Sequence, residues 1–75
     1  MSVLYEVENN KTYIVTKALE LPLLSSLGVY EGSVVEKCTT YKHGGPVLLL
    51  IEKREVAVGR DIAVQIEVEE YKGEE

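Results

Sequence analysis

The chain has 75 residues, 45% of them apolar, and carries a formal net charge of −5 at pH 7. A chain of this length forms one domain, and its apolar fraction is too high for an intrinsically disordered protein. The longest unbroken apolar run, residues 47–51, is far shorter than the roughly 20 residues that a membrane-spanning helix needs. We therefore expect a single domain over residues 1–75 with no direct membrane insertion.

The charges and the single cysteine indicate the setting of the protein. Residues 67–75 contain five acidic residues and one basic residue, so we expect a solvated acidic tail over about residues 69–75. An acidic chain without Trp or Phe is poorly suited to phosphate backbones, which argues against a nucleic-acid partner. Cys38 has no second cysteine to pair with and no secretory leader is recognisable, so we expect a cytoplasmic protein.

Two strands are predicted near the start of the chain. Residues 3–8 alternate between apolar and polar side chains, and residues 9–11 follow as a turn. Residues 12–19 form the second predicted strand, with Tyr13 and Val15 on the same face. Because neither face of this strand is fully polar, we expect both to be partly covered.

The spacing of apolar residues then changes to that of a helix. Leu21, Leu24 and Leu27 lie three apart, which predicts a helix of about six to eight residues. Pro22 suits the first turn of such a helix, where its missing N–H costs nothing. A helix this short is not stable alone in water, so we expect it to pack against other elements.

Two glycines redirect the chain after this helix. Gly28 follows the last leucine, where a helix commonly ends in the left-handed conformation. Gly32 precedes a β-branched run and allows the positive φ of a tight turn. The pair is therefore expected to end the helix and to direct the chain into the next strand.

The second half of the chain alternates short strands with turns. Residues 42–46 give the strongest turn signal, with Gly45 and Pro46 as the expected turn residues. The run 47–52 is apolar on both faces, which predicts a buried strand. Gly59 begins a short helical turn. The predicted elements of this half are strands over residues 33–41, 47–52, 55–58 and 64–71 and a helical turn over residues 59–63.

These elements predict an all-β fold of five to six short strands with one short helix and one helical turn. Short strands in a small chain must hide their edges, and closure into a barrel is a common solution. We therefore expect a small, partly open barrel with the short helix as its plug.

Three blocks of the sequence, in order and at suitable spacing, resemble the FeoA family. The blocks are Leu27-Gly28-Val29 with Gly32, then Gly45-Pro46-Val47, then Ala57-Val58-Gly59-Arg60-Asp61-Ile62-Ala63 followed by Ile66 and Val68. The resemblance covers residues 12–68 and implies an SH3-like domain, of a kind also found at the end of some metal-dependent repressors. The family often carries basic residues in the helix before Leu-Gly, whereas this helix region has a glutamate and no basic residue.

The resemblance also implies a function. FeoA-like proteins are associated with bacterial ferrous iron uptake and are thought to act on the membrane transporter FeoB, at its cytosolic GTPase domain. We therefore expect a small cytosolic accessory or regulatory protein that works by protein–protein contact. The alternative is a metal-responsive SH3-like module that binds Fe²⁺ or another divalent transition metal directly.

Groups for catalysis are scarce in the chain. It has one histidine, one cysteine and four serines, and it lacks the Gly-Lys-Ser/Thr ending of a phosphate-binding loop. We therefore expect that the protein is not an enzyme and that any nucleotide binds to a partner. The five tyrosines raise the alternative of a groove for proline-rich peptides, but no tryptophan is present to form its wall.

Cys38 and His43 are the candidate metal ligands, although their pattern is weak. They lie five residues apart across the end of a strand and its turn, and a site would need further ligands such as Glu36 or Asp61. The spacing lacks the paired cysteines or histidines of strong metal motifs. We therefore expect no bound cofactor, with weak binding of Fe²⁺ or another divalent metal as the alternative.

The leucine-rich helix and the turn after it form the candidate contact surface. By their spacing, the helix leucines Leu21, Leu23, Leu24 and Leu27 belong mostly to the core. A helix this short cannot bury all four, so Leu23 or Leu24 is expected to stay exposed beside Val29 and Tyr30. Exposed apolar patches on small domains often mark partner surfaces. The predicted contact residues are Leu23, Leu24, Leu27, Val29 and Tyr30, and the same patch would serve a homo-oligomer.

Overall fold

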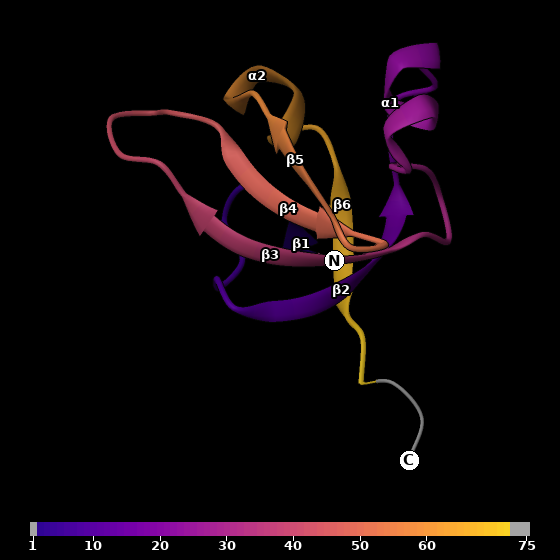
Figure 1. The fold of residues 1–75 in the computed structure, drawn as a ribbon, viewed down its shortest axis with the longest axis horizontal. Coiled ribbons are helices and arrows are strands. Elements are labelled where there is room, and N and C mark those ends of the chain that lie inside the picture. Colours follow the sequence, from indigo (N-terminus) through magenta and orange to yellow (C-terminus); the bar gives the residue numbers. More distant parts are fainter. Residues whose placement is uncertain (1, 73–75) are drawn as a thin grey trace.

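The structure, a computed structural model, describes residues 2–72 as one six-stranded antiparallel sheet with two short helices (Figure 1). The strands are β1 (Ser2–Val3), β2 (Lys11–Lys17), β3 (Val34–Thr40), β4 (Val47–Ile51), β5 (Arg54–Val58) and β6 (Glu67–Glu70), and the helices are α1 (Pro22–Leu27) and α2 (Arg60–Ala63). The strand order is β1-β6-β2-β3-β4-β5, and within residues 2–72 no pairing joins β5 back to β1. The fold is an open, SH3-like sheet, so the prediction of a small, partly open all-β barrel is confirmed. Residues 73–75 of the predicted acidic tail lie outside the described residues.

The sheet curves around one apolar core. Alternate residues of a strand point to opposite faces, and in β4 Val47, Leu49 and Ile51 are buried while Leu48 and Leu50 are half-buried. The core cluster comprises Leu4, Tyr13, Val15, Leu24, Val29, Val35, Val47, Leu49, Ile51, Val56, Val58, Ala63, Ile66 and Val68. The run 47–52 is predicted to form a strand that is buried on both faces. The partial burial of its outward-facing leucines agrees with this prediction.

The first strand ends earlier than the sequence predicts. The alternation over residues 3–8 predicts a strand, whereas β1 ends at Val3 and the chain then turns. The amide of Glu6 donates to the Val3 carbonyl over 2.9 Å, and the turn that this bond closes carries Leu4 into the core. The strand prediction is wrong here because a turn can also bury one side chain and expose the next.

The last strand is shorter than the sequence predicts as well. Residues 64–66 extend the turn of α2, since the amide of Val64 donates to the Arg60 carbonyl over 3.0 Å. β6 therefore begins at Glu67, which corrects the predicted strand over residues 64–71.

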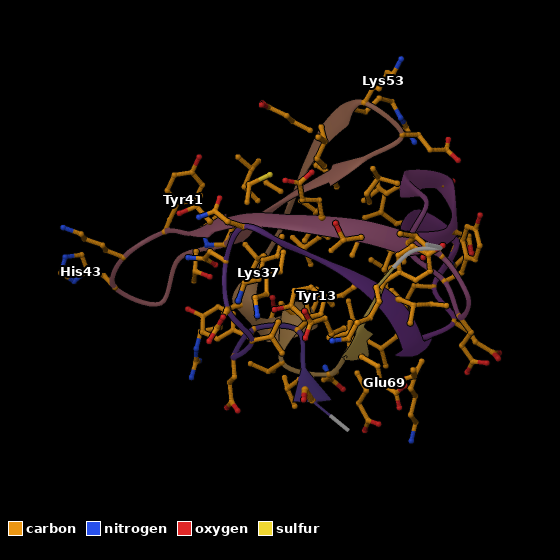
Figure 2. All side chains as sticks on the ribbon, turned by 90° about the horizontal axis from the view of Figure 1, so that it is seen from below. Tyr13, Lys37, Tyr41, His43, Lys53 and Glu69 are labelled. Carbon is orange, nitrogen blue, oxygen red and sulfur yellow. The ribbon has the colours of Figure 1, made fainter. Side chains whose placement is uncertain are left out.

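A buried lysine holds the N-terminal segment against the sheet. Lys37 lies two residues after Val35 on the inward face of β3 and is only 1% exposed, and Figure 2 shows it inside the molecule beside Tyr13. Its ammonium group donates hydrogen bonds to the carbonyl oxygens of Tyr5, over 3.0 Å, and Val7, over 2.6 Å. Removal from water lowers the pKa of Lys37. The lysine thus satisfies two backbone acceptors that lie outside the strands.

α1 ends at Gly28, which has a φ of 96°. The amide of Gly28 donates to the Ser25 carbonyl over 3.0 Å, and that of Val29 donates to the Leu24 carbonyl over 2.8 Å, so the last turn of the helix is capped. A Cβ atom at Gly28 would lie 2.9 Å from Cγ2 of Ile51, so glycine is required for space as well as for φ. Neither helix of the described chain has the length and apolar character needed to cross a membrane.

The other predicted turn residues lie in turns or at the ends of elements. Gly32 has a φ of 93° in the turn before β3. Gly45 donates its amide to the Lys42 carbonyl over 3.2 Å within the β3–β4 loop, and Pro46 immediately precedes β4. Gly59 is the N-cap residue of α2.

The β4–β5 connection is a two-residue turn under local strain. Both central residues have positive φ, 50° at Glu52 and 69° at Lys53. Turns of this kind favour Asn and Gly, because other side chains crowd the backbone at positive φ. The predicted strands over residues 47–52 and 55–58 leave residues 53–54 as their connection, so the turn lies one residue earlier than the sequence predicts.

Replacing Lys53 by Gly is expected to raise the free energy of unfolding by about 0.5–1 kcal/mol. Glycine removes the strain of a positive φ from the folded state, and this gain is larger than the free-energy cost of the greater chain entropy that glycine gives the unfolded state. Urea denaturation followed by far-ultraviolet circular dichroism measures the change. Glu55→Gly in β5 is the control and should lower the stability, since Glu55 lies within a strand. An unchanged or lower stability of Lys53→Gly would contradict the assigned turn.

Replacing Lys37 by Met is expected to lower the free energy of unfolding by about 1–3 kcal/mol near neutral pH, because two buried carbonyls lose their donor. The lowered pKa also predicts a pH dependence. Between that lowered pKa and the ordinary value of 10.5 the unfolded state binds more protons than the folded state, so this lysine contributes stability that rises with pH.

The difference in stability between the wild type and Lys37→Met should therefore grow as the pH rises through this window. Denaturant titrations of both proteins at a series of alkaline pH values measure it, and titrations common to the two proteins cancel in the difference. Lys42→Met, at an exposed lysine, is the control and should show neither the loss nor the slope. A constant difference would contradict the burial of the Lys37 ammonium group.

Candidate functional site

α1 lies at one end of the molecule, beyond the end of β2 and apart from α2 (Figure 1). Leu24 is its one buried residue. Leu23 on the helix is 67% exposed, Leu21 just before it is 41% exposed, and Tyr30 in the turn after it is 49% exposed. Three large apolar side chains therefore meet solvent around one short helix.

Two of the predicted contact residues belong to the core instead. Leu24 is 3% exposed and Val29 is 1% exposed, which corrects their assignment to an accessible surface, and Leu27 is half-buried. The sequence predicts that either Leu23 or Leu24 is exposed, and in the structure Leu23 is the exposed one. Leu21 is exposed although its spacing predicts burial, because it precedes the helix in extended backbone with a φ of −108° and a ψ of 133°.

A hollow of about 510 Å³ opens between the end of β2, the start of α1 and the turn after α1. We call this hollow the α1 groove, and it is lined by Ala18, Leu19, Glu20, Leu21, Pro22, Ser25, Tyr30 and Glu31. Most of the lining is apolar, and the charged groups among these residues are the carboxylates of Glu20 and Glu31. The sequence does not suggest this hollow, because its two sides come from stretches about ten residues apart.

The turn that carries Tyr30 is fixed by hydrogen bonds. The hydroxyl of Ser33 donates to the Tyr30 carbonyl over 2.8 Å, and the Tyr30 amide donates to the same hydroxyl oxygen over 3.2 Å. The amide of Gly32 donates to the Val15 carbonyl in β2 over 2.8 Å. The backbone on this side of the α1 groove is therefore tied both to itself and to the sheet.

A second hollow of about 530 Å³ lies between β1, the turn after it, β2 and the end of β6. It is lined by Ser2, Val3, Glu6, Val7, Glu8, Lys11, Tyr13 and Glu70. Lys11 forms ion pairs with Glu8, at 3.2 Å, and with Glu70, at 3.7 Å, and these carboxylates raise the pKa of Lys11. Two carboxylates of this hollow are thus paired by a lysine of the same chain.

Cys38, the first predicted metal ligand, lies at a bulge of β3. The pairing of β3 with β4 changes register between Lys37 and Thr39, so Cys38 is the extra residue. Partial burial, together with the carboxylates of Glu36 and Glu55, raises the pKa of the Cys38 thiol. Both effects disfavour the thiolate, the form that binds metals.

His43, the second predicted ligand, is exposed in the β3–β4 loop and points away from the rest of the molecule (Figure 2). Asp61 is exposed on α2. Over residues 2–72, no three His, Cys, Asp or Glu side chains are grouped so that they could hold a metal ion. Binding of a divalent metal through Cys38 and His43 stays a prediction.

Comparison with known families decides the relationship of this chain. The model described as "FeoA domain" matches residues 3–70. The chain belongs to the FeoA family. The resemblance seen in the sequence is therefore confirmed. No curated protein matches the chain.

Solved structures with FeoA domains share the fold. The crystal structure of an iron uptake regulatory protein (FeoA) is 21% identical, with a TM-score of 0.81 and coverage of 93% of this chain and 96% of that one. The solution structure of an FeoA protein from Chlorobium tepidum is 22% identical, with a TM-score of 0.80 and coverage of 97% and 73%. At these identities the likeness shows the fold alone.

The same fold is found within a larger protein. ScaR with bound Zn²⁺ is 20% identical to this FeoA-family chain, with a TM-score of 0.83 and coverage of 95% of this chain and 37% of that one. The chain therefore spans about a third of the length of ScaR, which is named a manganese-activated repressor in the crystal structure of its apo form.

The raised pKa of Cys38 predicts slow thiol chemistry near neutral pH. The thiolate is the reactive form, so alkylation by iodoacetamide should be slower in the folded protein than in the urea-unfolded chain, and the rate should level off at a higher pH. Glu55→Gln removes one carboxylate that raises the pKa, so its rate profile should move to lower pH. Glu69→Gln, at an exposed carboxylate of β6, is the control and should leave the profile unchanged. Identical profiles for folded and unfolded protein would contradict this prediction.

Proposed function

We propose that this FeoA-family protein is an accessory or regulatory protein of ferrous iron uptake and that it acts in the cytoplasm. Its partner in this proposal is the cytosolic GTPase part of an FeoB-type membrane transporter. The observation that carries the proposal is the FeoA domain match over residues 3–70. The similarity to the iron uptake regulatory protein over nearly the full length of both chains supports it. Iron is the transported ion in this proposal, and the chain itself holds no cofactor.

The surface around α1 supports action through contact with another protein. Leu21, Leu23 and Tyr30 are exposed within a short stretch, and exposed apolar patches on small domains often mark partner surfaces. Tyrosine is among the residues that most often contribute strongly to binding at interfaces. The fixed backbone around Tyr30 reduces the entropy lost when a partner binds.

A contact role also fits the surroundings of the chemically reactive side chains better than catalysis does. The thiol of Cys38 has a raised pKa, whereas a catalytic thiol usually needs a lowered one. His43 points away from the molecule at the β3–β4 loop and not into either hollow. We therefore propose a role in binding and no reaction.

The proposal is tested by titrating the ¹⁵N-labelled protein with the GTPase domain of the ferrous transporter from the same organism, with GDP and with a non-hydrolysable GTP analogue. Saturable amide shifts are expected around α1 and Tyr30. Leu23→Ser should weaken binding by about tenfold or more, because it removes an apolar side chain from the contact.

Val64→Ser is the matched control, because Val64 is an exposed apolar residue that follows α2. It should leave the affinity unchanged. Circular dichroism establishes that each variant is folded. No binding in either nucleotide state, with both proteins folded, would contradict the proposed partner, and equal losses in the two variants would contradict the proposed surface. Adding Fe²⁺ without the GTPase domain tests the predicted metal response, by shifts at Cys38 and His43.

A further inference from the structure

The two hollows described above differ in how their carboxylates are paired. In the hollow beside β1, Lys11 bridges Glu8 and Glu70, and only Glu6 is left outside these ion pairs. In the α1 groove, Glu20 and Glu31 are both exposed, and no lysine or arginine is among the lining residues. Across residues 2–72 neither of these two carboxylates forms an ion pair. The α1 groove therefore presents two negative charges that the chain itself does not neutralise.

The same groove presents apolar surface together with those charges. Leu21 and Pro22 line one side and Tyr30 lines the other, and Leu21 and Tyr30 are both substantially exposed. The volume of about 510 Å³ falls within the range of roughly 300–1,000 Å³ that small binding clefts occupy. A groove of this size holds a few side chains of a partner segment.

We propose that the α1 groove binds a protein segment in which an apolar side chain is flanked by lysine or arginine. The apolar side chain packs between Leu21 and Tyr30, and the basic groups pair with Glu20 and Glu31. This inference rests on the proposed function, and it specifies the chemistry that the partner must present. Charge complementarity selects this occupant, because two unpaired carboxylates on a chain of net charge −5 repel acidic segments and anionic lipid surfaces.

A second copy of the chain is the competing occupant. Its one pair of adjacent basic residues is Lys53 and Arg54 at the β4–β5 turn. The guanidinium of Arg54 donates to the carbonyl of Leu27 in its own chain over 3.4 Å, whereas Lys53 points into solvent (Figure 2). Through this turn a second copy could therefore pair only one of the two carboxylates of the groove. A segment of a different protein is the favoured occupant.

The first experiment uses peptides in place of the transporter. The labelled protein is titrated with three blocked pentapeptides up to about 5 mM, a range suited to millimolar affinities. Their sequences are Lys-Leu-Leu-Arg-Lys, Glu-Leu-Leu-Glu-Glu and Lys-Ser-Ser-Arg-Lys. The first peptide should shift the amides of Ala18, Leu21, Ser25 and Tyr30, and the acidic and the serine peptides should shift them at least about threefold less. Equal shifts with all three peptides, or shifts from the first peptide located elsewhere, would overturn the proposal.

The second experiment changes the charges of the groove. The double variant E20Q/E31Q should weaken binding of Lys-Leu-Leu-Arg-Lys by about threefold or more and should flatten its salt dependence. The double variant E55Q/E69Q removes the same charge from exposed positions outside the groove and should leave the affinity unchanged. Equal weakening in the two variants would show that net charge alone acts, and would overturn the proposal.

The two proposals fail in different ways. If the peptide binds in the groove and the GTPase domain does not bind at all, the groove chemistry stands and the transporter is the wrong partner. If the GTPase domain binds and its affinity is unchanged in E20Q/E31Q, the partner stands and the groove proposal is overturned. Groove shifts that grow with protein concentration in the absence of peptide would identify a second copy as the occupant and would also overturn it.

Discussion

The buried ammonium group of Lys37 is the interaction on which the arrangement of this fold depends. A charged group out of water is costly unless hydrogen bonds compensate, and here the carbonyls of Tyr5 and Val7 supply them. The hydroxyl of Tyr13 donates to the Glu8 carbonyl over 2.8 Å, and the Asn10 amide donates to the Lys37 carbonyl over 2.6 Å. Together these bonds hold the whole stretch between β1 and β2 against the sheet. They also fix where β2 begins. Because α1 follows β2, they thereby fix where α1 starts.

Regular patterns made much of the fold predictable from the sequence. The spacing of Leu21, Leu24 and Leu27 and the position of Gly28 predict α1 and its end, although Leu21 itself lies just before the helix. Gly28 marks the end because helices commonly end at a residue that tolerates positive φ. Lys37 could not be foreseen, since a lysine in an alternating strand is normally taken as exposed. The same omission explains the error over residues 3–8, where the groups that bind the turn come from a residue about thirty positions away.

The candidate site was predictable only in part, for a related reason. Periodicity distinguishes core from surface within a helix, but α1 has six residues, and Leu21 lies just outside it in extended backbone. The α1 groove arises because the bonds between Ser33 and Tyr30 place that turn opposite the start of the helix. Neither the position of Leu21 nor the bonds between Ser33 and Tyr30 can be predicted from the local apolar pattern of the sequence. The exposure of Leu23 and Tyr30 could be predicted from the sequence, whereas the acidic lining of the α1 groove could not.

The close approach of Gly28 to Ile51 has a consequence for how the groove can move. With no side chain on Gly28, the end of α1 already rests against β4, and the bond from Arg54 to the Leu27 carbonyl ties that end to β5. The C-terminal end of the helix is therefore held against the sheet by two strands. Any change in the width of the α1 groove at Leu21 would have to come from the N-terminal end of the helix, beside Pro22, and not from a movement of its C-terminal end.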